Sequence, residues 1–222
     1  MKKVVNTVVF LLFTYPAGLC IGVVFEFLWG SGILEVRGWE NFPKQKGKIL
    51  LISNHPSLVE PVLLIGVFFH QYVLRPFKYG PWTLADRKNY YDNWKFFLMR
   101  PRLIPVDRTK DKGDVRSLVA AKHILEGGAN ILIFPEGGRT FKGIHHLVSW
   151  GGRRLKMIRP LKGGFSVLAT GKGVVAVPVW FEFHGWSNMR LTIGKPVCFE
   201  GTPREEVVKI TQAMLLRLAD AS

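Results

Sequence analysis

The chain has 222 residues, of which 48% are hydrophobic and 13% aromatic, and its formal net charge is +15. This length fits one folded domain with a full core, and the composition excludes an intrinsically disordered chain. A surface this basic predicts a polyanionic partner. Because the aromatic residues are mostly Phe within apolar runs, we expect membrane lipids as partners and no nucleic acid. Cys20 and Cys198 lack metal-ligand spacing, so we expect no metal site.

The segment from Val4 to Trp29 is almost entirely apolar. It lacks the small residues of a signal-peptide cleavage site. Pro16 and Gly18 divide it into halves of about twelve residues, each about 18 Å long as a helix, whereas the hydrocarbon core of a bilayer is about 30 Å thick. We therefore expect residues 1–30 to form a membrane anchor, a re-entrant or interfacial helical hairpin. The alternative is one kinked transmembrane helix.

Basic residues flank this anchor on both sides: Lys2 and Lys3 before it, and Arg37, Lys44 and Lys46 after it. The positive-inside rule places both flanks in the cytoplasm. We therefore expect the protein at the cytoplasmic face of the cell membrane.

The apolar run from Gly47 to Ser53 predicts a buried strand, and His55 follows it closely. Pro56 holds His55 out of helical geometry, so this histidine is expected in a loop at the carboxyl end of the strand, where open α/β sheets bind ligands. An imidazole titrates near neutral pH and could act as a base on a bound hydroxyl group. Glu60 is its candidate partner, provided that the chain turns between the two residues.

A structural interpretation of the same stretch is also open. Ser57 to Glu60 fits a capping box that opens the next helix. Pro61 instead favours a helix that begins at Glu60, because a proline at the first helical position deletes no hydrogen bond.

Strands and helices alternate along the rest of the chain. We expect strands over 103–106, 130–134 and 174–181 and helices over 114–126 and 202–218. We also expect a strand within 71–79, a hairpin of 189–193 with 196–199, and a long loop over 141–160 that acts as a lid or membrane-facing lip. The alternation predicts an α/β domain over residues 31–222, with a mixed sheet flanked by helices.

Charged residues follow three of these strands: His55 with Glu60, Asp107 with Arg108, and Glu136 with Arg139. If the strands are neighbours, these side chains converge. Arg108 and Arg139 could then grip a phosphate group. The backbone of Gly137 and Gly138 could approach the same oxygens, and Glu136 could hold Arg139 or bind a hydroxyl group. The alternative for each arginine is an ordinary surface ion pair.

Four blocks of the sequence resemble, in order, the motifs of the 1-acyl-glycerol-3-phosphate acyltransferase family. They are Asn54-His55 to Glu60, Leu103 to Arg108, Phe134 to Thr140, and Val177 to Val179, with a basic glycine turn at Leu161 to Phe165 before the last. The resemblance implies a membrane-bound enzyme that moves a fatty acyl group to the free hydroxyl of a lysophospholipid. The donor is acyl-CoA or acyl carrier protein, a co-substrate, and no cofactor is expected.

The resemblance also implies residue roles. His55 is the general base and Glu60 its partner. The predicted substrate-binding residues are Asn54, Arg108, Glu136, Gly137, Gly138 and Arg139. The expected acceptor is lysophosphatidic acid, which gives phosphatidic acid in phospholipid biosynthesis.

Two positions depart from the family pattern. Glu60 stands where the family has Asp, as in the similar lipid A acyltransferases, and Gly138 stands where it has Thr. Two alternatives therefore stay open. One is an acyltransferase for a different lysolipid or an amino-acid lipid, and the other is a non-catalytic basic protein that binds membranes.

Overall fold

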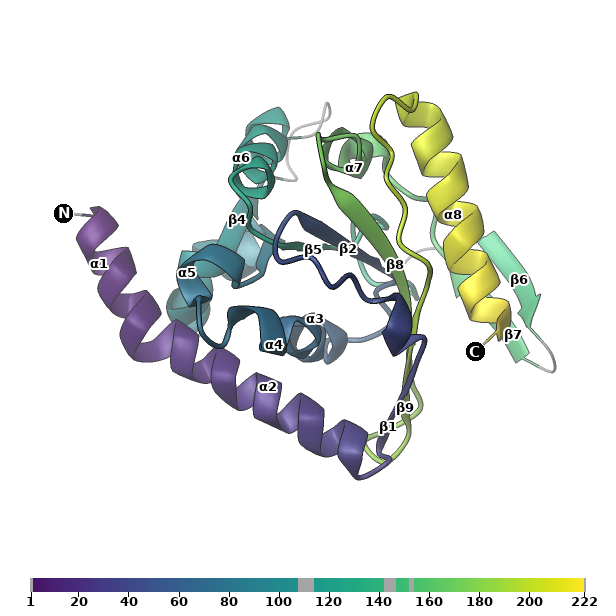
Figure 1. The fold of residues 1–222 in the computed structure, drawn as a ribbon, viewed down its shortest axis with the longest axis horizontal. Helices are drawn as coiled ribbons and strands as arrows, with labels where there is room; N and C mark the ends of the chain where they lie inside the picture. Colours follow the sequence, from purple (N-terminus) through teal and green to yellow (C-terminus); the bar gives the residue numbers. More distant parts are fainter. Residues whose placement is uncertain (1, 108–113, 142–146, 152–153, 222) are drawn as a thin grey trace.

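The computed structural model describes residues 2–107, 114–141, 147–151 and 154–221 (Figure 1). Its centre is a seven-stranded sheet of order β1-β9-β8-β2-β5-β3-β4. The strands are β1 (Leu34–Arg37), β2 (Ile49–Ser53), β3 (Trp82–Asp86), β4 (Leu103–Val106), β5 (Ile131–Ile133), β8 (Val175–Phe183) and β9 (Met189–Ile193). From β8 to β4 the neighbouring strands are parallel, whereas β9 is antiparallel to β8 and β1 is parallel to β9. The sheet is mixed, and the carboxyl ends of its parallel strands share one edge.

Helices cover both faces of this sheet (Figure 1). One face carries α6 (Val115–Glu126), α7 (Ser166–Ala169) and α8 (Arg204–Ala221). The other carries α2 (Tyr15–Gly30), α3 (Glu60–Leu63), α4 (Phe69–Tyr72) and α5 (Pro76–Tyr79). Side chains of β2 alternate between the two cores, with Leu50 in the first and Leu51 in the second. The predicted fold, a mixed α/β sheet flanked by helices, is confirmed.

Short helical turns complete the connections. They are the 3-10 helices η2 (Trp39–Asn41), η3 (Gly66–Phe68), η5 (Trp94–Arg102) and η6 (Gly163–Phe165), and the π-helical turn η4 (Arg87–Tyr91). The predicted strands at 103–106, 130–134 and 174–181 and the helix at 114–126 are confirmed, with small shifts at their ends. The closing helix is also confirmed, and its buried residues include Thr211 and Leu215.

The N-terminal segment is one helix. Here α1 (Lys2–Val9), the π-helical turn η1 (Phe10–Thr14) and α2 follow each other without a break in right-handed helical geometry. The predicted hairpin is therefore wrong. Pro16 directly follows the π-helical turn, at the start of α2, and the wider turn accommodates the proline within a continuous helix. Within this helix Val4–Gly30 is long and apolar enough to cross a membrane, which agrees with membrane association.

Three other predictions are wrong. Residues 71–79 lie in α4 and α5 instead of a strand, because Pro76 starts a new helical turn. The strand β9 pairs with β8 and not with 196–199, of which Val197 bridges to Ala176 of β8. In the segment predicted as a loop, β6 (Leu147–Gly151) and β7 (Arg154–Ile158) form an antiparallel pair beside α8 (Figure 1).

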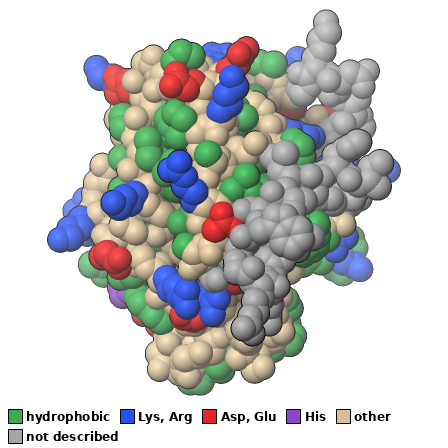
Figure 2. Space-filling model, turned by 90° about the vertical axis from the view of Figure 1, so that its right-hand side faces the viewer, with side chains coloured by type: hydrophobic (Ala, Val, Ile, Leu, Met, Phe, Trp, Pro, Cys, Tyr) green, Lys and Arg blue, Asp and Glu red, His purple; other side chains and the backbone are tan. Residues whose placement is uncertain are grey.

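One strand that the sequence did not indicate changes the layout of the site. β3 lies between β5 and β4, so the end of β4 is one strand further from His55 than expected. The basic residues are also spread out on the face that Figure 2 shows. On the described part of the face that carries α8, Lys and Arg side chains stand apart, with Asp, Glu and hydrophobic side chains between them (Figure 2).

Candidate active site

The loop after β2 is fastened to the neighbouring strand β8. The side-chain amide of Asn54 donates to the carbonyl oxygen of Phe181 (2.9 Å), and its oxygen accepts from the N–H group of the same residue (2.8 Å). Asn54 is fully buried and is not among the residues that line the cavity described below. These contacts fix the position of His55, while the substrate-binding role of Asn54 stays a prediction.

His55 and Glu60 form a direct contact, as the sequence predicts. A turn at Pro56 brings the carboxylate Oε1 of Glu60 to Nδ1 of His55. The other oxygen, Oε2, accepts from the N–H group of Ser57 (3.0 Å) and from its hydroxyl group. Glu60 starts α3 with Pro61 directly behind it, so the predicted start of the helix is confirmed. The carboxylate therefore makes both the contact to the candidate base and the contact typical of a capping box.

Glu136 is a second buried carboxylate behind His55. Its Oε1 accepts from the N–H group of His55 (2.8 Å) and from the Thr140 hydroxyl (2.7 Å), and its Oε2 accepts from the N–H group of Arg159 (2.9 Å). Burial raises the pKa of Glu136, and these hydrogen bonds oppose the rise. Both of its oxygens are bonded to the protein, so Glu136 holds the backbone of the candidate base in place. Its predicted contact with substrate stays a prediction.

The turn after β5 supports the imidazole ring. The ring of Phe134 stacks against His55 with centroids 4.7 Å apart. The N–H group of Gly137 donates to the carbonyl oxygen of Phe134 (3.1 Å), and Gly137 has a positive φ of 68°, which favours glycine. The N–H group of Thr140 also donates to the carbonyl oxygen of His55 (2.7 Å). The loops after β2 and β5 are therefore joined by several hydrogen bonds.

The predicted phosphate-binding residues are only partly brought together. Gly137 and Gly138 line the same cavity as His55, whereas Arg139 is exposed and is not among the lining residues. Arg108 lies outside the described residues. Asp107, the residue before it, lines the cavity.

Two cationic residues that the sequence interpretation did not select lie on this turn. A Cβ atom at Gly137 would come within 2.9 Å of Lys162 Nζ, and one at Gly138 within 2.8 Å of Arg159 Nη1. Lys162 belongs to the basic glycine turn noted in the sequence, which could have indicated it. Arg159 follows a strand of the segment predicted as a loop, so no local pattern indicated it.

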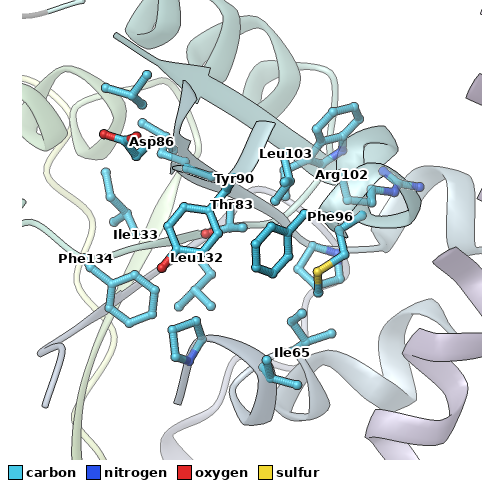
Figure 3. A pocket seen from close by; sticks show the side chains of 18 of the residues that line it. Ile65, Thr83, Asp86, Tyr90, Phe96, Arg102, Leu103, Leu132, Ile133 and Phe134 are labelled. Atoms are coloured by element: carbon cyan, nitrogen blue, oxygen red, sulfur yellow. The ribbon is translucent and has the colours of Figure 1, made fainter. Parts of the chain in front are cut away.

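A cavity of about 970 Å³ lies beside His55 (Figure 3). Its lining is mostly apolar and comes from α3, β3, β5, η5 and the N-terminal helix; it includes Ile65, Phe96, Leu103, Leu132 and Phe134. In Figure 3, Arg102 lies at the end remote from Phe134. In the described part of the chain no group of three or more His, Cys, Asp and Glu side chains could hold a metal ion. The arrangement places His55, the candidate base, at the wall of a mostly apolar cavity.

Comparisons with known proteins agree with this geometry. A family model described as acyltransferase matches residues 33–182. The 1-acyl-sn-glycerol-3-phosphate acyltransferase of Pseudomonas aeruginosa is 27% identical over 191 residues, which cover 80% of this chain and 64% of that protein. The chloroplastic 1-acyl-sn-glycerol-3-phosphate acyltransferase LPAT1 of Arabidopsis thaliana is 24% identical over 180 residues, which cover 74% of this chain and 43% of that protein. The chain thus spans less than two thirds of the length of these relatives.

The fold also matches a solved structure. The crystal structure of the 1-acyl-sn-glycerophosphate (LPA) acyltransferase PlsC from Thermotoga maritima aligns with a TM-score of 0.58. The alignment covers 98% of this chain and 97% of that one, at 20% sequence identity. At this identity the match supports the arrangement of the elements.

Proposed function

Because the chain belongs to the acyltransferase family, we propose that it transfers a fatty acyl group from an acyl thioester to the free hydroxyl group of lysophosphatidic acid, giving phosphatidic acid. One observation carries the proposal: the His55–Glu60 pair lies beside a large apolar cavity. The donor is acyl-CoA or acyl-ACP, the acylated form of acyl carrier protein.

The proposed proton transfers start from the contact between Glu60 and His55. Glu60 accepts from the Nδ1–H group of His55, so Nε2 of the neutral ring carries the free lone pair. Nε2 takes the proton of the acceptor hydroxyl group while the hydroxyl oxygen attacks the thioester carbonyl carbon. The carbon–sulfur bond then breaks, and the imidazolium returns the proton to the departing thiolate. Glu60 stabilises the imidazolium between these two steps.

The apolar part of the cavity suits the acyl chain of the donor. Its walls include the side chains of Leu103 of β4 and Leu132 of β5. Burying a hydrocarbon chain there gains about 0.8 kcal/mol per methylene group. The thioester carbonyl is then at the end beside His55, where the acceptor hydroxyl group must also bind. The sequence-based candidates for the acceptor phosphate are Arg108 and Arg139.

The first test is transfer itself. Purified protein is mixed with an acyl thioester and lysophosphatidic acid, and thiol release and phosphatidic acid are both measured. A panel of other lysolipids and amino-acid lipids identifies the acceptor. His55→Ala is expected to lower turnover by about 10² to 10⁴-fold. A folded His55→Ala protein with wild-type turnover would exclude His55 as the base, and no transfer to any acceptor would favour the non-catalytic membrane-binding alternative.

We also propose that the N-terminal helix lies in the plane of the membrane at the cytoplasmic face, instead of spanning it. The helix contacts the domain along its length: Thr14 donates to the carbonyl oxygen of Leu98, Tyr72 donates to that of Gly18, and Phe25 is fully buried. Its outer face is apolar and exposed, at Leu11, Leu12, Phe13, Val23, Val24 and Phe27. Lipid is the solvent that suits such a face.

Depth measurements separate the two orientations. Labels at Leu12→Cys and Phe27→Cys, in a background in which both exposed free cysteines are replaced (Cys20→Ser and Cys198→Ser), are quenched by lipids that carry quenchers at known depths. An in-plane helix puts both labels at similar depths. A spanning helix separates them by about 22 Å, because each residue rises about 1.5 Å.

A further inference from the structure

Two hydrogen bonds from backbone N–H groups join the segment after β7 to the turn after β5. The N–H group of Lys162 donates to the carbonyl oxygen of Pro135 (2.9 Å). The N–H group of Arg159 donates to Glu136 Oε2 (2.9 Å), and Oε1 of the same carboxylate accepts from the N–H group of His55. One buried carboxylate therefore connects the backbone of the base to the segment that carries both cations.

The side chains of these two residues lie directly on the glycines of the turn. A Cβ atom at Gly137 would be 2.6 Å from Lys162 Cε, and one at Gly138 would be 2.8 Å from Arg159 Nη1. Both distances are shorter than a van der Waals contact, so a side chain at either glycine would displace a cation. The two glycines thus leave room for a lysine and an arginine side by side.

Lys162 is a lining residue of the cavity and Arg159 is not, but Nη1 of Arg159 lies against Gly138 in the cavity wall. Lys162, Gly137 and Gly138 line the cavity together with His55, and the turn supports the imidazole through Phe134. Within the described residues no acid forms an ion pair with Lys162 or Arg159. The positive charge is therefore available to an anionic ligand.

We propose that Lys162 and Arg159 bind the phosphate group of the acceptor, an inference that rests on the proposed acyl transfer. A guanidinium group and an ammonium group together match the oxygens of a phosphate monoester. The acceptor is the source of that phosphate because only two carbon atoms separate its reacting hydroxyl from its phosphate ester, so its phosphate must bind close to His55, and this turn contacts the His55 ring through Phe134. The phosphates of a coenzyme A donor are a whole pantetheine arm away from the thioester.

Turnover with four substrate combinations tests the source of the phosphate. The acceptors are lysophosphatidic acid and the monoacylglycerol of the same chain, in neutral detergent. The donors are acyl-CoA and the acyl thioester of N-acetylcysteamine, which has no phosphate. The variants are Lys162→Met, Arg159→Met and the double variant, with Lys172→Met and Arg217→Met as matched controls at exposed positions.

Only the kinetics with lysophosphatidic acid are expected to change. Each single variant raises the KM for lysophosphatidic acid by about tenfold and the double variant by about a hundredfold, with either donor, because a charge-assisted hydrogen bond contributes about one to two powers of ten in affinity. Monoacylglycerol turnover and both controls stay at wild-type values. Equal losses with both acceptors overturn the proposal. A loss that disappears with the phosphate-free donor also overturns the proposal. Arg139→Met is measured in the same assay, and a loss found only in that variant overturns the proposal as well.

A binding measurement keeps this inference separate from the proposed function. Titration of the full-length wild-type protein with glycerol 3-phosphate, without donor, is expected to show saturable binding that the double variant weakens at least about tenfold. Binding without any turnover would contradict the acyl transfer but keep the anion site. Turnover without such binding, or binding that the double variant leaves unchanged, overturns the site.

Discussion

The loops around His55 and the contact between the N-terminal helix and the domain are held together by different forces. Around His55, backbone N–H groups donate to two fully buried carboxylates, Glu60 and Glu136. Along the helix, Phe25 packs on Gly66 and Phe69 packs on Gly22. Hydrogen bonds fix both distance and direction, whereas apolar packing fixes mainly shape. Substitutions near His55 should therefore change turnover, and substitutions along the helix should change stability and docking first.

The largest effect is expected for Glu60→Gln. The Glu60 carboxylate uses one oxygen for Nδ1 of His55 and the other for Ser57, whereas a glutamine has only one acceptor oxygen. If the oxygen stays with the N–H group of Ser57, the amide NH₂ group faces Nδ1 of His55 and stabilises the wrong tautomer, with the proton on Nε2. Turnover should fall by up to about 10⁴-fold with little change in KM, as expected for loss of a carboxylate that orients a catalytic histidine. Steady-state kinetics and the melting temperature measure the two effects.

Two control variants sharpen this prediction. Glu60→Asp keeps the charge and should lose less turnover. Ser57→Ala removes the hydroxyl group, which donates to Glu60 and accepts from the N–H group of Val59 (3.0 Å), but leaves the Ser57 N–H group on the carboxylate, so it should lose far less turnover than Glu60→Gln. If Glu60→Gln turns over like the wild type, Glu60 only caps the helix and the catalytic pair does not exist.

The next largest effect is expected for Glu136→Gln. The amide oxygen should take the place of Oε1, where the N–H group of His55 and the Thr140 hydroxyl converge. The NH₂ group then faces the N–H group of Arg159, and that hydrogen bond is lost. We expect a loss of about 1 to 3 kcal/mol of stability and about a tenfold loss of kcat/KM, mainly through the acceptor KM. Glu200→Gln is the control, because this exposed carboxylate also accepts from a backbone N–H group, that of Gly173 (3.1 Å).

The same variant has a distinct dependence on pH. Burial raises the pKa of Glu136 above its ordinary value of 4.5. The folded state therefore holds this proton more tightly than the unfolded chain does. The stability from Glu136 is fully present below pH 4.5 and is lost as the pH rises through the raised pKa. Unfolding curves from pH 4 to 8 should show this decline in the wild type, and Glu136→Gln should lack it. Parallel curves for the two proteins would contradict the prediction.

The sequence predicted the parts of this site that follow from neighbouring residues. His55, Pro56 and Glu60 lie within six positions, so a turn alone brings them together. The strands β2 and β5 are short apolar runs, and the loops with His55 and Glu136 follow directly after them. Lys162 and Arg159 reach the turn through contacts between distant segments: β7 pairs with β6, and the N–H groups of Arg159 and Lys162 donate to Glu136 and to the carbonyl oxygen of Pro135. The helix was misjudged because a π-helical turn, which has no sequence signature, absorbs Pro16.

A smaller effect is expected in the apolar part of the cavity. Ile65 of the segment after α3 lines this space (Figure 3). Ile65→Phe fills part of it, so turnover with a long acyl donor should fall about tenfold relative to a short one, since a missing or extra methylene in an apolar pocket changes binding by about 1 to 3 kcal/mol. Competition between acyl thioesters of different lengths measures the ratio. Leu74→Phe, at a position 87% exposed, is the control and should not change it.

The smallest effect on turnover is expected at the contact between the helix and the domain. At Gly22 a Cβ atom would be 2.1 Å from the ring of Phe69, and at Gly30 it would meet nothing within 4 Å. Gly22→Ala should therefore lower stability by about 1 to 3 kcal/mol through overpacking, even though alanine favours a helix by about 1 kcal/mol. Turnover of the folded enzyme should fall only a few-fold, because no hydrogen bond near His55 changes.

Gly30→Ala is the matched control on the same helix. Alanine has a higher helix propensity than glycine, and at position 30 its Cβ atom meets no neighbouring atom, so the melting temperature of this variant should equal or exceed that of the wild type. Thermal unfolding and turnover of both variants are measured in the same vesicles. They show whether the contact between the helix and the domain affects mainly stability, as expected for apolar packing, or mainly turnover. If Gly22→Ala lowers turnover a hundredfold at unchanged stability, the helix controls the chemistry as strictly as the loops around His55 do. The distinction between directional and apolar contacts would then not describe how this protein works.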